Sequence, residues 1–414
     1  MSNKLWPLRS LGDCAKFLSG GTPSKARAEF WDGDIPWVSS GEMTEPRIHD
    51  TPLRVTADGA EDGSRLVPTN TVLAVVRGMS LAKEFRVAIT KREVAFNQDL
   101  KAFACKPDVD PEFLFYALFA RREHIRELAT EASHGTKKLE TPTLAAVELP
   151  MPKPEIQRRT VEVASAYDEL MENNRRRMGL LEEAARLLYR EWFVRLRSPG
   201  HEHTRITHGV PDGWEKKTLE EVCSEGDGIQ TGPFGSQLHQ ADYTDEGVPV
   251  VMPTNIIGFR ISVDGIARIP EELADKLGRH RMIPGDTVYG RRGDIGRRAF
   301  ISRRHAGWFC GTGSLRIRPN LKAINPRYLF DTLGSPETAG TIANRAKGAT
   351  MPNLNGGVLK SVPVLVAPRS LQDIYAEQVE PMADMIETLA VQNQKLRAAR
   401  DLLLPRLMSG EIAV

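Results

Sequence analysis

The stretch "LLEEAARLLYREWF" (residues 180–193) has the apolar spacing of an amphipathic helix, and "KLRAARDLLLPRLM" (residues 395–408) repeats that spacing near the end of the chain. The two stretches align without a gap, which matches Leu181 with Leu396 and Trp192 with Leu407 at a constant offset in residue number. Because this offset is a little over half of the 414 residues, it indicates one duplicated large unit. Solenoid repeats, in contrast, have periods of about 20–50 residues.

Other segments repeat in the same order. "DPEFLFYAL" (110–118) matches "NPRYLFDTL" (325–333) at the same offset, and in both an Asp or Asn at the N-cap precedes a proline at the first helical position. "LVPTNTVLAVVRG" (66–78) matches "MIPGDTVYGRRG" (282–293), and "WPLRSLGD" at Trp6 matches "WEKKTLEE" at Trp214. The duplication therefore covers nearly the whole chain.

Each unit is predicted to contain an α+β domain followed by one long helix. The first part of each unit reads as short strands broken by Pro, Gly and Asp, with one helix beginning at Pro111 or Pro326. The predicted boundaries are 1–152 for the first domain, 153–197 for the first long helix, 198–212 for a linker, 213–366 for the second domain and 367–414 for the second long helix and tail. His201, His203 and His208 lie within the predicted linker 198–212. Their spacing fits an exposed connection better than a metal site.

The long helices are predicted to pair as an antiparallel coiled coil, because their seam positions alternate in steps of three and four, whereas a face that packs on a globular domain drifts at 3.6 residues per turn. The alternative is two separate helices, each packed on its own domain. Some 39 residues of helix would form a rod of about 55–60 Å, which would space two inverted domains. A single Asn in each seam can fix the register. The seam residues of the first helix are Ala164, Tyr167, Met171, Asn174, Met178, Leu181, Ala185, Leu188 and Trp192, and those of the second are Val379, Met382, Ile386, Leu389, Asn393, Leu396, Arg400, Leu403 and Leu407.

Composition predicts a protein of the cytoplasm, without a membrane segment. The N-terminus has no apolar signal region, no apolar run reaches the length of a membrane span, and the net charge is +2. Four scattered cysteines without a CxxC pair argue against zinc and against a disulfide framework. The chain lacks a phosphate-binding loop and a methyltransferase tetrapeptide. We therefore expect no catalytic centre, no metal and no cofactor on this chain.

Basic residues suggest a nucleic-acid interface. Residues 279–304 contain eight arginines and two acids, which is either a solvated face or a footprint for phosphate. Arg291, Arg292 and Arg297 flank one loop, and Arg77 and Lys83 lie in the matching loop of the first unit. Amides and hydroxyls that could read base edges lie nearby in the sequence, although each of them taken alone fits turn chemistry or a phosphate contact better than base readout. Two similar domains held apart along an axis suit duplex DNA, in which half-sites repeat along the helix.

The sequence resembles the specificity subunits of Type I restriction-modification systems. The segments that carry the resemblance are "GGTPSK" (20–25), "GDIPWVSSGEM" (33–43), "NQD" (97–99), "RRGDIGR" (291–297) and "LLLPRLMSGEI" (402–412), together with the duplication. The first unit departs from the pattern, with "RGMSLAK" where the second has "RGDIGR". Pro405 also interrupts the second helix, so we expect its last turn to kink or to end there.

The resemblance implies two target-recognition domains that read a bipartite double-stranded DNA site. It also implies two methyltransferase subunits that bind S-adenosylmethionine and two restriction subunits that use ATP and Mg²⁺. The residues that we expect to contact DNA are Thr22, Ser24, Lys25, Ser39, Ser40, Arg77, Lys83, Asn97, Gln98, Lys137, Lys138, Gln230, Gln237, Asn255, Arg291, Arg292, Arg297, Thr312, Ser314 and Lys347. The alternative function is a coiled-coil adaptor that binds proteins through its two domains and reads no DNA.

Overall fold

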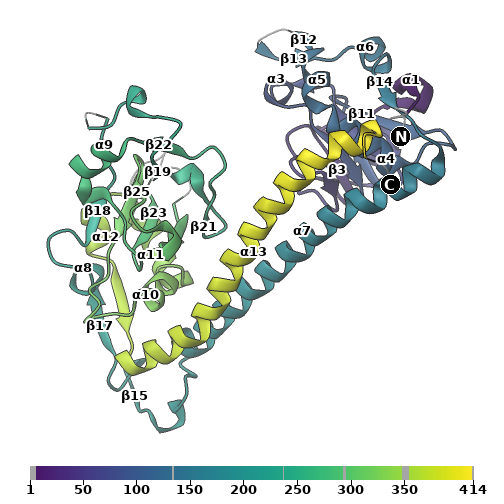
Figure 1. The fold of residues 1–414 in the computed structure, drawn as a ribbon. Coiled ribbons are helices and arrows are strands. Elements are labelled where there is room, and N and C mark those ends of the chain that lie inside the picture. The colour runs from purple at the N-terminus through teal and green to yellow at the C-terminus, as the bar shows by residue number, and fades with distance from the viewer. Residues whose placement is uncertain (1–5, 133–134, 236, 292–294, 347–353, 413–414) are drawn as a thin grey trace. The chain divides into compact units, whose positions relative to one another are not determined.

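The computed structural model describes residues 6–132, 135–235, 237–291, 295–346 and 354–412. The chain divides into two compact units. Unit 1 combines Met1–Arg176 with Leu389–Val414, and unit 2 is Arg177–Thr388. Two long helices, α7 (Pro154–Tyr189) and α13 (Arg369–Ser409), each contribute one part to unit 1 and the other part to unit 2. This arrangement confirms the predicted α+β class with two long helices (Figure 1).

Unit 1 is built on two sheets. A five-stranded sheet has the order β2-β11-β7-β9-β4, and a four-stranded sheet has the order β5-β3-β10-β6, in which β3 and β10 are parallel. The strands are β1 (Leu8–Ser10), β2 (Ala15–Ser19), β3 (Trp31–Val38), β4 (Arg47–Ile48), β5 (Arg54–Val55), β6 (Leu66–Val67), β7 (Val72–Val75), β8 (Arg77–Gly78), β9 (Val87–Thr90), β10 (Val94–Phe96), β11 (Leu100–Cys105), β12 (Thr130–Glu131), β13 (Lys137–Lys138) and β14 (Glu148–Pro150). The helices are α1 (Leu11–Cys14), α2 (Ala57–Gly63), α3 (Ser80–Lys83), α4 (Pro111–Ala120), α5 (Arg122–Glu127) and α6 (Thr141–Ala145).

The central strands of unit 1 are apolar along their whole length because both faces of the sheet are covered. All four residues of β7, "VLAV", are buried. Val72 and Ala74 point into the core that includes helix α4, whereas Leu73 and Val75 point into a second core with Val38 and Phe96. Alternate side chains of a strand lie on opposite faces, so a strand buried on both faces shows no polar alternation.

Unit 2 repeats this plan. Its sheet has the order β18-β26-β23-β24, and β19 runs parallel to β25 as β3 runs parallel to β10. The strands are β15 (Ile206–Thr207), β16 (Val210–Pro211), β17 (Glu215–Thr218), β18 (Ile229–Thr231), β19 (Val248–Val251), β20 (Ile256–Ile257), β21 (Arg260–Ile261), β22 (Ala267–Ile269), β23 (Thr287–Gly290), β24 (Arg298–Phe300), β25 (Phe309–Cys310), β26 (Ser314–Ile317) and β27 (Pro363–Val366). The helices are α8 (Leu219–Val222), α9 (Glu271–Lys276), α10 (Pro326–Thr332), α11 (Pro336–Arg345) and α12 (Gly356–Lys360). The β15-β16 hairpin lies where the sequence suggested a linker without structure.

A repeated hydrogen-bond pattern shows the duplication at atomic detail. The amide oxygen of Gln157 on α7 accepts from the backbone N–H of Asp110 at 2.8 Å, and Gln372 on α13 accepts from Asn325 at 2.8 Å. Asp110 and Asn325 cap α4 and α10 with their side-chain oxygens, and both helices have proline at the start. The sequence prediction of two equivalent caps is therefore confirmed, and in each unit a glutamine fixes the cap to a long helix.

The long helices pair antiparallel in each unit. In unit 1 the Asn174 side chain donates to Asn393 at 2.9 Å. In unit 2 the rings of Trp192 and Tyr375 lie 6.0 Å apart, and these residues are 18 positions after Asn174 and 18 positions before Asn393. Both units therefore share one antiparallel register, and every predicted seam residue is buried or half-buried.

Two features of the helix ends differ from the sequence prediction. Helix α7 continues as a π-helical turn over Arg190–Val194. Helix α13 continues through Pro405 to Ser409, so of the two predicted outcomes, a kink or an end at Pro405, the end is wrong. Leu404, Leu407 and Met408 are buried in the core of unit 1, and this packing outweighs the backbone hydrogen bond that proline removes. Within the described ranges, no helix is long and apolar enough to span a bilayer.

Candidate nucleic-acid interface

The basic residues predicted in the first domain come together on a small sheet of unit 1. Strand β13 pairs antiparallel with β8, which places Lys138 opposite Arg77 and Lys137 opposite Gly78. Gly78 has a φ of 130°, a conformation that favours glycine, and helix α3 follows directly and ends at Lys83. Arg77 and Lys83 are exposed, and the Lys138 ammonium lies 2.5 Å from Glu140. We call these four basic residues, Arg77, Lys83, Lys137 and Lys138, together with Ser40, the basic surface. The backbone carbonyl oxygen of Ser40 accepts a hydrogen bond from the Arg86 side chain at 3.5 Å.

Backbone hydrogen bonds connect the basic surface to the polar turns at the ends of neighbouring strands. The amide of Val76 donates to Asp99, and the amide of Leu139 donates to Val76, both at 2.8 Å. The amide of Asn97 donates to Val38 at 3.0 Å, next to Ser39. Because β3 and β10 are parallel, their carboxyl ends meet at one edge, as they do in many ligand sites of α/β sheets.

The "GGTPSK" segment crosses this edge. A Cβ atom on Gly20 would lie 2.1 Å from the carbonyl oxygen of Phe96, so only glycine fits here. The Thr22 hydroxyl donates to the side-chain oxygen of Gln98 at 2.7 Å, and Ser24 and Lys25 are exposed in the same loop. Loop residues from distant parts of the sequence, including Thr22, Ser39, Gln98 and Arg77, therefore lie at the ends of adjoining strands.

Some predicted contact residues are buried and serve the fold in this structure. The amide of Asn97 is buried and both of its polar atoms contact Asp99, which leaves Gln98 as the exposed amide of the turn. In unit 2, Asn255 is buried and accepts from the amide of Met252, and the buried hydroxyl of Ser314 donates to Val251. These three side chains form turn and strand contacts.

Arg291 also lies inside unit 2, and the duplication explains why. Its carbonyl oxygen accepts from Leu354 at 2.9 Å, as that of Val76 accepts from Leu139, so Arg291 occupies the position of Val76 and is 8% exposed. The counterpart of the exposed Arg77 is Arg292, which lies outside the described residues, as does Lys347. Arg297 is exposed on the same loop.

The remaining polar residues predicted in unit 2 gather near one loop. Thr312 donates to Pro233 at 3.0 Å, Gln237 accepts from Arg279 at 3.2 Å, and Gln230 donates to the backbone of Thr231. Phe234 lies in this loop, is 54% exposed, and has the Arg291 guanidinium 5.8 Å from its ring centroid. Sequence reasoning missed Phe234, although an aromatic residue between Pro and Gly in "GPFG" is a signal for an exposed contact. It included Arg279 in the arginine cluster of residues 279–304 without naming it as a DNA contact.

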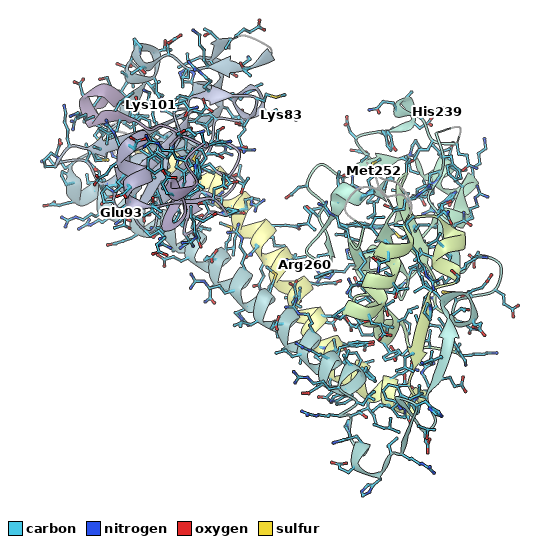
Figure 2. All side chains as sticks on the ribbon, turned by 180° about the vertical axis from the view of Figure 1, so that it is seen from behind. Lys83, Glu93, Lys101, His239, Met252 and Arg260 are labelled. Carbon is cyan, nitrogen blue, oxygen red and sulfur yellow. The ribbon has the colours of Figure 1, made fainter. Side chains whose placement is uncertain are left out.

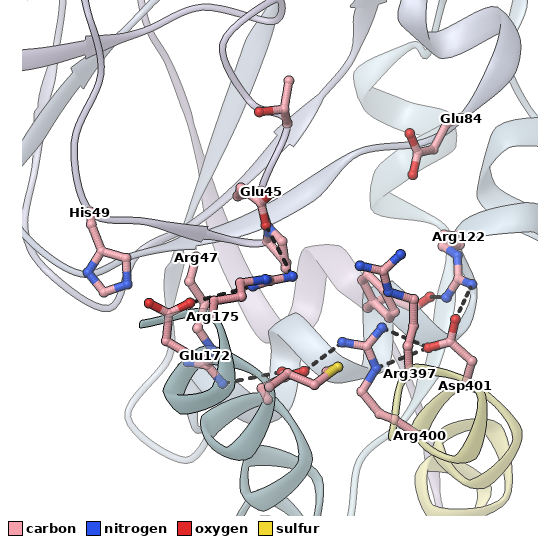
Figure 3. Close-up of a pocket in the computed structure, with 15 residues that line it drawn as sticks. Glu45, Arg47, His49, Glu84, Arg122, Glu172, Arg175, Arg397, Arg400 and Asp401 are labelled. Atoms are coloured by element: carbon pink, nitrogen blue, oxygen red, sulfur yellow. Dashed lines mark hydrogen bonds and ion pairs between the residues drawn. The ribbon is translucent and has the colours of Figure 1, made fainter. Parts of the chain in front are cut away.

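Each unit also joins its domain to the helices. In unit 2 Arg260, in the β20-β21 hairpin, reaches Glu182 on α7 at 3.3 Å (Figure 2). In unit 1 a cavity of about 580 Å³ lies between β4 and the two helices, and arginines from both sides line it (Figure 3). Figure 3 shows Arg122 and Arg400 both directed at Asp401, and Arg175 bridges Glu45 and Glu172. Since these guanidinium groups have carboxylate partners, the cavity is a joint between domain and helices.

A buried carboxylate network continues this joint. Arg47 and Lys91 hold Glu112, and although burial by itself raises the pKa of that carboxyl group, the hydrogen bonds from Lys91 and Arg47 lower it overall. The Tyr116 hydroxyl donates to Asp168 at 2.7 Å, and Arg400 donates to the other oxygen of Asp168 at 2.6 Å. For Arg400, burial lowers the pKa, but the carboxylates of Asp168 and Asp401 outweigh it and raise the pKa.

Comparisons with known proteins agree with this architecture. Residues 3–183 match the Type I restriction modification DNA specificity domain. Over nearly its whole length the chain is also similar to curated Type I specificity subunits. The MjaIX Type I restriction enzyme specificity subunit of Methanocaldococcus jannaschii is 25% identical over 99% of this chain and 94% of its own length. A Type I specificity subunit of Escherichia coli is 28% identical over 39% of this chain and 41% of its own.

A solved structure shows the same fold. The crystal structure of a Type I S subunit from M. genitalium aligns with a TM-score of 0.58 at 16% identity, and the alignment covers 99% of this chain and 97% of that one. The resemblance inferred from sequence is therefore confirmed. In the part of the chain that the structure describes, no group of three or more His, Cys, Asp or Glu side chains could hold a metal ion.

Proposed function

We propose that this specificity subunit reads a bipartite site in double-stranded DNA, one half with the domain of each unit, with an unread spacer between the halves. The observation that carries the proposal is the strand-end cluster of unit 1, where Arg77, Lys137 and Lys138 adjoin the polar turns at Thr22 and Gln98. Basic groups position phosphates, and amides and hydroxyls can contact base edges. The duplicated fold provides a second, differently lined edge in unit 2.

We propose further that the chain directs partner subunits and supplies no chemistry itself. The partners would be two methyltransferase subunits with bound S-adenosylmethionine and two restriction subunits that use ATP and Mg²⁺. The helices carry a matched apolar feature that suits such docking. Leu187 in unit 2 and its counterpart Leu402 in unit 1 are 50% and 77% exposed, so the same position of the repeated helix presents a leucine in each unit.

The direct test is domain exchange. Residues 213–366 are replaced by the equivalent domain of another specificity subunit, and the complete system is expressed in cells whose DNA methylation is then mapped. We expect one half of the methylated sequence to change and the other half to stay. A change in both halves, or in neither, would contradict reading by separate domains.

The adaptor hypothesis is tested separately. The chain, with its methyltransferase partner, is titrated against random duplex DNA at rising salt. We expect the affinity to fall steeply with salt. Each phosphate that the protein neutralises lowers the slope of log affinity against log salt concentration by about 0.9, because counterions are released from the DNA. Absence of binding at every salt concentration would favour an adaptor that binds only proteins.

A further inference from the structure

The duplication gives the two long helices similar apolar seams. Helices with similar seams can pair with each other, or each can pair with the same helix of a second chain. The second arrangement, α7 on α7 and α13 on α13, would bury nearly the same apolar positions. Apolar burial alone therefore does not decide between the two arrangements.

Four polar side chains of unit 1 form contacts across the seam. The Asn174 amide nitrogen donates to the side-chain oxygen of Asn393 at 2.9 Å, and the Asn393 nitrogen donates to the backbone of Met171 at 3.1 Å. Six residues before Asn174, the Asp168 carboxylate accepts from the Arg400 guanidinium at 2.6 Å (Figure 3 shows Arg400). Asn174 is 2% exposed, Asp168 6% and Arg400 7%.

None of the four has a polar counterpart in the other copy. At the offset that matches Leu181 with Leu396, the equivalent positions are Leu389 for Asn174, Met178 for Asn393, Ala383 for Asp168 and Ala185 for Arg400. Each helix therefore carries one half of each polar pair, and the matching half exists only on the other helix.

Replacing α13 by a second copy of α7 shows the consequence. Met178 would stand where Asn393 stands and Ala185 where Arg400 stands. Asn174 would lose its amide partner, and Asp168 would lose Arg400 at 2.6 Å and keep only the more distant Arg47 at 3.5 Å. Both losses would occur twice in a symmetric pair. Two copies of α13 would likewise leave Arg400 beside Ala383. Buried polar and charged groups without partners are strongly unfavourable, so like pairing is penalised.

We propose that Asp168, Asn174, Asn393 and Arg400 form a pairing code that admits only α7 with α13. The code keeps two copies of this chain from joining through like helices, which their similar seams would otherwise allow. The inference does not depend on DNA reading, because it concerns only the helices.

A cysteine reporter tests the pairing code in the full-length chain. Leu181 is the counterpart of Leu396, so Met171→Cys and Leu181→Cys would face each other only across an α7–α7 pair of two chains. Within one helix these positions are ten residues, or about 15 Å, apart, which is too far for a disulfide. The reporter chain is unfolded in urea, refolded under mild oxidation, and its covalent dimer is quantified on a non-reducing gel.

The decisive variant adds the counterpart residues to the reporter: Asp168→Ala, Asn174→Leu, Asn393→Met and Arg400→Ala. We expect this chain to form at least tenfold more covalent dimer than the reporter with the native code. A matched control, Asp168→Glu with Arg400→Lys, keeps an acid on α7 and a cation on α13 and should leave the dimer at the native level.

Two results would overturn the proposal. One is equal covalent dimer from the native and the symmetrised reporter, whatever its amount. The second result concerns a smaller variant, which is used if circular dichroism shows that the fourfold variant does not refold. The reporter with only Asn174→Leu and Asn393→Met then replaces it, and no increase in its dimer over the native reporter would refute the code.

Discussion

The most distinctive contacts between domain and long helices lie at different positions of the repeat in the two units and differ in chemistry. In unit 1 the joint is a buried network of charges, centred on Asp168 with Tyr116 and Arg400. In unit 2 it is a cluster of aromatic rings, in which Phe193 lies within 6 Å of the ring centroids of Tyr189, Tyr328, Tyr375 and Trp214. The duplicated fold therefore carries a buried ionic contact in one unit and an aromatic cluster in the other.

The aromatic cluster and the buried ion pair differ in what they contribute: the first mainly stability, the second mainly specificity of pairing. Aromatic packing gains from apolar burial and tolerates many partners of similar shape. A buried ion pair adds little net stability, because desolvation offsets the attraction, but its disruption leaves a charge without a partner. In unit 2 we therefore expect the aromatic contacts to contribute mainly stability. In unit 1 we expect the ion pair to contribute mainly specificity, because each charge requires its opposite charge as a partner.

The largest effect is expected from Phe193→Ala in unit 2. The substitution removes the centre of the aromatic cluster and should lower the free energy of unfolding of unit 2 by about 3–5 kcal/mol. Hydrogen exchange of α10 and of strand β27 measures the loss. The matched control is the counterpart Met408→Ala, which should raise exchange in α4 of unit 1 and leave α10 protected; loss of protection in both units from either variant would contradict separate joints.

Breaking the ion pair in unit 1 should have the next largest effect. Arg400→Ala removes the closer cation of the buried Asp168 carboxylate and leaves Arg47 at 3.5 Å, so we expect a cost of about 3 kcal/mol in the free energy of unfolding. The double variant Asp168→Ala with Arg400→Ala should be clearly more stable than Arg400→Ala alone. Urea unfolding of the three proteins decides this, and additive losses would show that the pair is not coupled.

A buried histidine distinguishes unit 2 under acid. His280 is 1% exposed and accepts from Arg279, and burial together with that charge lowers its pKa to about 4, below the usual 6.5. Between these values the unfolded chain binds a proton that the folded unit does not, so stability should fall as the pH decreases, by up to about 3 kcal/mol. Among the histidines that the structure describes in unit 1, His49 and His124 are both exposed.

The variant His280→Gln tests this difference, because glutamine keeps an acceptor and does not titrate. The stability of the native protein relative to this variant should decline from pH 6.5 to pH 4 and stay constant above pH 7.5. Parallel pH profiles of the two proteins would rule out His280 as the source of the acid sensitivity.

The smallest effect concerns the basic surface of unit 1. Lys137→Ala with Lys138→Ala should reduce the slope of log affinity against log salt by about 1–2, since each phosphate contact contributes about 0.9. Lys106→Ala is the control, because Lys106 follows the opposite end of β11 from the turn at Gln98. An unchanged slope in the double variant would remove these lysines from the interface.

Much of the fold could be predicted from sequence because local patterns carry it. The constant offset between matched segments identified the duplication, and the Asn/Asp-Pro caps predicted α4 and α10. The candidate site was harder. Asn97, Arg291 and Ser314 have the residue types that contact DNA, yet they are buried. Exposure depends on neighbours that are distant in sequence, and only comparison of Arg291 with Val76 in the duplicated fold explains its burial.

By itself, the sequence determined that one unit is repeated, that each copy holds an α+β domain and a long helix, and that the helices have matching seams. These features follow from periodicity and capping, which are local. Only the tertiary structure decided that Lys138 lies beside Arg77, and that Asp168 and Asn174 meet partners in the other half of the chain, Arg400 and Asn393. Such pairs form because buried polar groups must find partners wherever folding places them, and no local pattern encodes that place.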